Sequence, residues 1–126
     1  MKKIINTDQA PAAIGTYSQA IVHGNTLYTS GQIPIDPATG EMLPAEFKAQ
    51  AHQVFKNLVA VAEAAGTSLQ NAIKLNVFLQ DLEEFALLNQ VMGEYIQAPY
   101  PARAAIQVAR LPKDSLIEID AIIAVN

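Results

Sequence analysis

The chain has 126 residues, of which 51% are hydrophobic and only 16% charged, and its formal net charge is −4. This length predicts one domain over residues 1–126, and the scattered Lys and Arg residues disfavour nucleic-acid binding, which basic stripes mediate. The chain has no cysteine, which excludes disulfides, thiol nucleophiles and thiolate metal sites.

The low charge also predicts self-association. A small domain has much surface for its volume and ordinarily carries about 25% charged residues. The surplus apolar surface is expected to pack against other copies of the chain as a homo-oligomer.

The first six residues begin like a signal peptide but turn polar from Asn6, and no apolar run reaches membrane-spanning length. We expect a cytoplasmic protein with no membrane partner.

The first half of the chain predicts a hairpin and a helix. Residues 20–23 and 27–30 read as strands closed by a turn that contains Gly24, and residues 36–40 form a second turn. Apolar residues at three- and four-residue steps predict an amphipathic helix over residues 44–65, with Gly66 as its C-cap.

The second half predicts a strand, a helix and two further strands. Residues 73–79 alternate with period two, which places Ile73 and Leu75 on one face. A second helix is expected from Asp81, its N-cap, to about Gln97. The runs 99–109 and 116–125 read as strands joined as a hairpin through residues 111–115. The order indicates an α+β fold, a mixed β-sheet with two helices on one face.

The final strand has two unlike faces. The residues at odd positions from 117 to 125 are apolar and are expected to pack on the helices. The opposite face carries Glu118 and Asp120 among apolar residues, so we expect it to face a neighbouring subunit.

Arg103 lies among small and branched residues, where a charge is costly unless it is paired or used on a ligand. One interpretation is a structural ion pair with Glu118 or Asp120. The other is bidentate capture of a ligand carboxylate, favoured by small neighbours and by the rigid Pro99-Tyr100-Pro101 segment before it. Glu118 or Asp120 would then orient or deprotonate a water, and strand parity does not choose between them.

Other candidates are weaker. Tyr17 is equally consistent with an interface residue and with a phenol that points into a cleft. Ser30-Gly31 is typical of a turn, but it could also supply a hydroxyl and a close backbone N–H to a ligand. Asn89 reads as a surface residue of the second helix. His23 and His52 have no partner at metal-ligand spacing, and no serine triad or phosphate loop is present. Any catalysis is therefore expected to use only simple steps: binding an acid, positioning a water molecule and transferring a proton.

These residues resemble the RidA/YjgF family of imine deaminases along nearly the whole chain. The most specific block consists of Pro101-Ala102-Arg103 and the segments 108–112 and 117–121. The other matching stretches are residues 10–20, 28–34, 40–41, 57–58 and 64–66. The resemblance implies a chorismate-mutase-like fold, a homotrimer with ligand sites between subunits, and no cofactor or metal. It also implies hydrolysis of 2-imino acids, such as 2-iminopropanoate and 2-iminobutanoate, to 2-keto acids and ammonia.

The resemblance assigns roles residue by residue. The arginine matching Arg103 grips the substrate carboxylate, and the glutamate matching Glu118 positions the attacking water, which selects Glu118 over Asp120. Residues matching Tyr17, Ser30, Gly31 and Asn89 line the pocket. Several members carry a cysteine where this chain has Ala105, so only its carbonyl is expected to accept a hydrogen bond from the water.

Three alternatives stand beside the deaminase. The first is a regulator that binds small carboxylates in the same cleft without turnover. The second is a ribonuclease or translation inhibitor, against which the acidic balance and the lack of a catalytic histidine pair argue. The third is a chaperone-like role based on exposed apolar surface.

Overall fold

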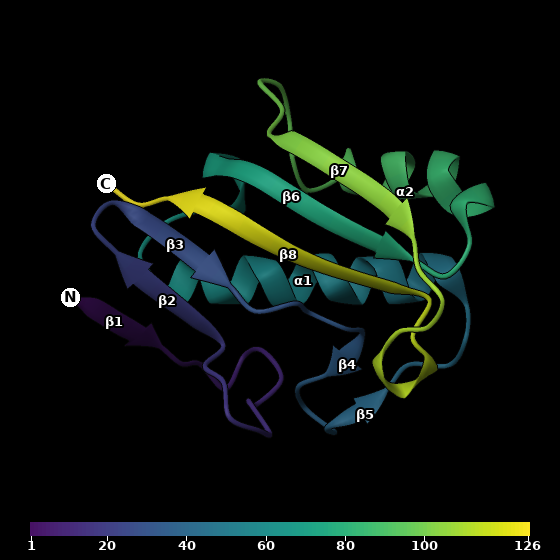
Figure 1. Cartoon of the computed structure of the whole chain (residues 1–126), viewed down its shortest axis with the longest axis horizontal. Coiled ribbons are helices and arrows are strands. Elements are labelled where there is room, and N and C mark those ends of the chain that lie inside the picture. Colours follow the sequence, from purple (N-terminus) through teal and green to yellow (C-terminus); the bar gives the residue numbers. More distant parts are fainter.

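A six-stranded mixed sheet runs through the molecule in the order β1-β2-β3-β8-β6-β7, and both helices lie on one of its faces (Figure 1). The structure is a computed structural model that describes residues 1–126. The helices are α1 (Phe47–Ala64) and α2 (Phe85–Met92). The strands of the sheet are β1 (Lys2–Ile5), β2 (Ala20–His23), β3 (Thr26–Thr29), β6 (Ala72–Leu79), β7 (Ala102–Gln107) and β8 (Ile117–Ala124), and β4 (Ile35–Asp36) and β5 (Glu41–Met42) form a separate small hairpin. The predicted α+β class, with helices on one face of a mixed sheet, is confirmed.

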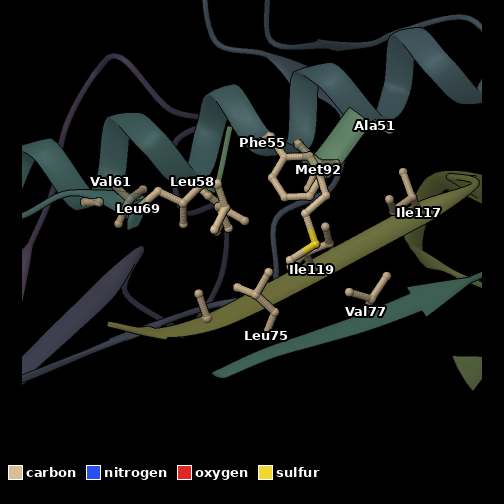
Figure 2. Packing of buried hydrophobic residues seen from close by; sticks show 14 of the residues in the cluster. Ala51, Phe55, Leu58, Val61, Leu69, Leu75, Val77, Met92, Ile117 and Ile119 are labelled. Carbon is tan, nitrogen blue, oxygen red and sulfur yellow. The ribbon is translucent and has the colours of Figure 1, made fainter. Parts of the chain in front are cut away.

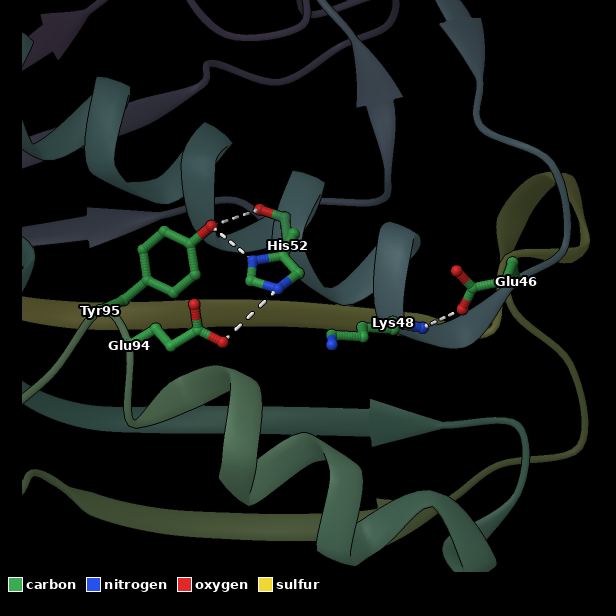
Figure 3. Close-up of polar contacts among 5 residues, drawn as sticks. All are labelled: Glu46, Lys48, His52, Glu94 and Tyr95. Carbon is green, nitrogen blue, oxygen red and sulfur yellow. Dashed lines mark hydrogen bonds and ion pairs between the residues drawn. The ribbon is translucent and has the colours of Figure 1, made fainter.

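Helix α1 begins and ends at defined caps. The Glu46 carboxylate accepts a 2.7 Å hydrogen bond from the backbone N–H of Lys48 (Figure 3). At the other end Gly66 adopts φ +78°, and the N–H groups of Gly66 and Thr67 donate to the carbonyls of Glu63 and Ala62. This is a Schellman motif, whose left-handed residue favours glycine. The predicted helix is therefore confirmed, although it starts three residues later than expected.

The core fills the space between α1 and the neighbouring strands β8 and β6 (Figure 2). Phe55 and Leu58 of α1 are fully buried against this layer. The strands contribute every second residue to it: Leu75, Val77 and Leu79 from β6, and Ile117, Ile119, Ala121 and Ile123 from β8. The two faces predicted for the final strand are thus confirmed on the helix side.

The predicted hairpin between the last two strands is wrong. Both strands pair with β6, β7 in parallel and β8 antiparallel, so β6 lies between them. Strand β8 buries its helix side fully and takes the centre of the sheet, whereas β7 has mostly exposed side chains and lies at the edge. Arg103 therefore lies on an edge strand, and not on a buried one.

Two smaller predictions also need correction, and one strand was missed. The second helix begins as predicted, with Asp81 capping a 3-10 turn, but α2 ends at Met92, before Gly93, and turns follow. Ile73 is half exposed because the pairing of β6 with β8 shifts between Ala72 and Lys74. Strand β1 was not predicted, because its four residues carry no alternating pattern.

The segment after α2 is attached to α1 by a polar cluster (Figure 3). The Tyr95 hydroxyl lies 2.8 Å from Nδ1 of His52, and the Glu94 carboxylate lies 3.7 Å from Nε2 of the same ring. Tyr95 also stacks on Phe55, and burial raises the pKa of its phenol. Neither α1 nor α2 combines the length and the hydropathy that a membrane-spanning helix requires.

Buried amides hold the loops at one end of the sheet. The Gln19 side chain bonds the backbone of Thr7, Ala10 and Pro11. Asn57 donates to the carbonyls of Ile33 and Ile35 at 3.3 and 3.1 Å and is 1% exposed. These neutral groups fix the loops in place without introducing buried charge.

Replacing Asn57 by Ala is expected to reduce the free energy of unfolding by about 2 kcal/mol, because two backbone carbonyls lose a buried donor. Gln53→Ala, one turn earlier in α1, removes a single bond to Asn57 and leaves both backbone carbonyls paired, so it should reduce stability by less, about 1 kcal/mol. Urea unfolding measures both variants. Equal losses would show that the two carbonyl contacts do not stabilise the fold.

Candidate functional site

A cavity of about 620 Å³ opens where the N-terminal loop, the β4–β5 hairpin and the loop before β8 meet. It receives one carboxylate, that of Glu118. The lining residues are Pro11, Ala12, Ile14, Tyr17, Gln19, Ser30, Gly31, Gln32, Ile33, Ile35, Pro37, Gly40, Pro112, Lys113 and Glu118. The structure thus brings together four residues that the sequence singled out: Tyr17, Ser30, Gly31 and Glu118.

Glu118 is half-buried beside the backbone of Gly31. A Cβ atom at Gly31 would overlap the Glu118 carboxylate, so only glycine allows this close approach. Burial raises the pKa of Glu118, and the negative charge of Asp120 raises it further. The ion pairs of the structure join other residues, so no cation balances this carboxylate.

Tyr17 and Ser30 lie near Glu118 in the same cavity. The Ser30 hydroxyl donates a 2.6 Å hydrogen bond to the carbonyl of Ser18, and its backbone N–H donates to the carbonyl of Gln19. The Tyr17 ring is half exposed, and its hydroxyl accepts a bond of 3.4 Å from the N–H of Ile14. Both hydroxyls are therefore held by local backbone and keep lone pairs free for a ligand.

Arg103 lies in a second cavity, of about 470 Å³, between β7 and α2. Its Nη1 donates to Oδ1 of Asn89 at 2.7 Å and lies 3.5 Å from the sulfur of Met92. The guanidinium carbon lies 5.0 Å from the centroid of the Phe85 ring. Asn89, on α2, is thus a partner of Arg103, while Ala105 lies two residues further along the same face of β7.

The two cavities belong to opposite faces of the sheet. Arg103 pairs in register with Leu75, which points into the helix side. Glu118 pairs with Phe78, which points to the outer side. Paired residues on neighbouring strands point the same way, so an ion pair between Arg103 and Glu118 of one chain is excluded. Asp120 likewise lies on the outer face, and accepts a hydrogen bond from Asn76.

Two features of this region went unpredicted. Lys113 and Asp114 both have left-handed backbones, with φ of 55° and 56°, in the loop that borders the cavity. Non-glycine residues rarely adopt this conformation, and the sequence carries no glycine to signal it. The second is the pairing of Asn76 with Asp120. Asn76 is a polar residue in an alternating strand, but predicting its partner requires the register between β6 and β8.

No three His, Asp or Glu side chains gather closely enough to hold a metal ion.

Comparison with known proteins supports the resemblance seen in the sequence. The profile of the family described as Endoribonuclease L-PSP matches residues 7–125. The chain is 47% identical to the 2-iminobutanoate/2-iminopropanoate deaminase of Rattus norvegicus over 122 residues, which cover 97% of this chain and 89% of that protein.

Solved structures agree with the fold. The crystal structure of RidA from the Antarctic bacterium Psychrobacter sp. has a TM-score of 0.94 and 54% identity, covering 98% of this chain and 99% of that one. The structure of E. coli TdcF with bound serine has a TM-score of 0.91 and 46% identity, covering 98% of this chain and 99% of that one. The match of profile, relatives and structures along almost the whole chain shows that the protein belongs to the RidA/YjgF family.

Proposed function

We propose that the protein hydrolyses small 2-imino acids to 2-keto acids and ammonia. One observation carries the proposal: Glu118 lies half-buried in a cavity, and no cation of the protein engages its carboxylate. Such a group is suited to accept a proton from a water, because burial raises its pKa. The relatives named as imine deaminases support this choice of reaction.

Arg103 is the proposed carboxylate anchor. Asn89 and Phe85 hold the guanidinium in one orientation, yet no acidic side chain pairs with it. One terminal nitrogen bonds Asn89, which leaves N–H donors for a bidentate contact with a ligand carboxylate. The structure of the relative TdcF holds serine, a small molecule with a carboxylate.

A complete site requires two chains under this proposal, because Arg103 and Glu118 lie on opposite faces of one sheet. The outer face also has an apolar row that no helix covers. In this row Ile4, Ile21, Tyr28 and Ile122 follow one another in register across four strands, and Ile4 is 65% exposed. We infer that these faces meet in a homotrimer, with the Arg103 side of one chain against the Glu118 side of the next.

The proposed reaction begins with the protonated imine held by Arg103. Glu118, helped by the Ala105 carbonyl, orients a water, which attacks the imine carbon as Glu118 takes its proton. The resulting carbinolamine receives this proton on nitrogen, and the C–N bond breaks to release ammonia. Glu118 takes the hydroxyl proton as that oxygen becomes the keto oxygen, and then passes the proton to solvent. Tyr17, Ser30 and Gly31 bind and orient the substrate. Positioned proton transfer of this kind contributes about 10²–10⁴-fold.

Arg103→Ala and Glu118→Gln are each expected to lower kcat/KM for 2-iminopropanoate by at least about 10²-fold, because they remove the anchor and the base. The imine is generated in situ, and its decay is followed with and without protein. Wild-type rates in both variants would refute the assignment. A wild-type protein that binds pyruvate but does not speed imine decay would select the non-catalytic regulator.

Mixing the two variants tests whether the site is shared. Arg103→Ala and Glu118→Gln chains, coexpressed with different tags and purified through both tags, should regain about one third of the wild-type rate, since every mixed trimer has one interface in three that pairs an intact Arg103 with an intact Glu118. Each variant alone should stay inactive. Mixed assemblies without recovered activity would show that the two residues do not serve one shared site.

Gly31→Ala is expected to lower kcat/KM by about 10²-fold, because the added methyl group displaces the Glu118 carboxylate. The melting temperature should change little, since a carboxylate at the end of a flexible side chain moves easily. Gly24→Ala is the matched control: its φ of +62° costs about 1 kcal/mol of stability, but no atom lies near the added methyl group. Full activity in the folded Gly31→Ala protein would contradict the close approach.

A further inference from the structure

Asp120 has no role in the reaction proposed above, although it lies on the same face of β8 as Glu118, two residues further on. The register places Asp120 opposite Asn76 on β6 and Glu118 opposite Phe78. Asn76 Nδ2 donates a 2.7 Å hydrogen bond to Oδ1 of Asp120, and both side chains are partly buried. The Asp120 carboxylate is thus held in place by a neutral donor.

The surroundings of Glu118 allow the negative charge of Asp120 to affect the Glu118 carboxylate without direct contact. Residues two apart on a strand are separated by about 7 Å. Phe78 flanks Glu118 on β6 and the Gly31 backbone lies against its other side, so the carboxylate is shielded from water on these two sides. A bond from a neutral amide fixes Asp120 without cancelling its negative charge.

Within one chain, four other titratable groups face this region. In the proposed trimer the Arg103 guanidinium of the next chain also faces Glu118, and it is the same in every Asp120 variant. Tyr17 and Lys113 line the same cavity from the loops, and Lys74 of β6 and Tyr28 of β3 lie on the outer face, in register with Ile122. Neither lysine forms an ion pair with Glu118 or Asp120. Asp120 is therefore the fixed charge on β8 that faces the same way as Glu118.

We propose that Asp120, held by Asn76, is a positioning residue whose fixed negative charge helps Glu118 to take a proton from the attacking water. The role of the proton acceptor rests on the proposed function, but the effect of one carboxylate on the other does not. Asp120 repels the ionised form of Glu118 and so favours its protonated form. Burial and Asp120 act in the same direction on the pKa of Glu118.

The test is a titration of the Glu118 carboxyl carbon by NMR in the full-length assembled protein, with Glu118→Gln used to assign the signal. Asp120→Asn keeps an oxygen for Asn76 but removes the charge, so the midpoint of Glu118 should move to lower pH. Asp120→Glu keeps the charge and should keep the midpoint higher than in Asp120→Asn. Asp120→Ser serves as the neutral variant if Asp120→Asn does not fold.

An unchanged midpoint in a folded neutral variant would overturn the role of Asp120. The pH profile of kcat/KM gives a second readout: its acidic limb should move to lower pH in Asp120→Asn, and its plateau should fall because Glu118 becomes a weaker base. A merely structural residue would lower the rate equally at every pH. Imine hydrolysis is not needed for the titration, so an inactive wild-type protein would refute the proposed function without deciding the role of Asp120.

Discussion

The alternation of side chains along the central strand β8 is the constraint on which the rest of the structure depends. Its odd positions are buried under α1 and supply the core, which forces its even positions, Glu118 and Asp120, to the side that no helix covers. The same alternation turns Arg103 toward α2. A single sheet therefore presents a cation on one face and a carboxylate on the other, and this separation is why the proposed site requires two chains.

Much of this arrangement could be predicted from the sequence, because periodicity is a local property. The first hairpin, α1, β6 and the two faces of β8 all follow from residue spacing. The pairing of strands does not: β7 and β8 are separated by a short loop, yet β6, which comes before both, lies between them. Sequence distance alone favoured a hairpin there, and only the unequal burial of the two strands distinguishes centre from edge.

The candidate site shows the same limit. Composition and strand parity identify Arg103, Glu118 and Asp120 as candidate functional residues, and the family resemblance selects Glu118 over Asp120. The contact of Glu118 with Gly31 depends on a long-range approach between β8 and the segment after β3, which no local pattern encodes. Nor does any turn residue in the sequence announce the left-handed backbone of Lys113 and Asp114.

The burial of Glu118 beside Gly31 also makes the free energy of folding depend on pH. A carboxyl group whose pKa is raised on folding binds its proton more tightly in the folded chain than in the unfolded one. Folded and unfolded states then differ in proton uptake, and above the folded pKa the ionised Glu118 opposes folding, an effect that fades as the pH falls through that value. The buried amides that hold the surrounding loops act as a counterweight, since their hydrogen bonds do not depend on pH in this range. The ionised carboxylate of Glu118 is thus less stable in the folded protein than in water. A bound cationic group such as an iminium would reduce that cost.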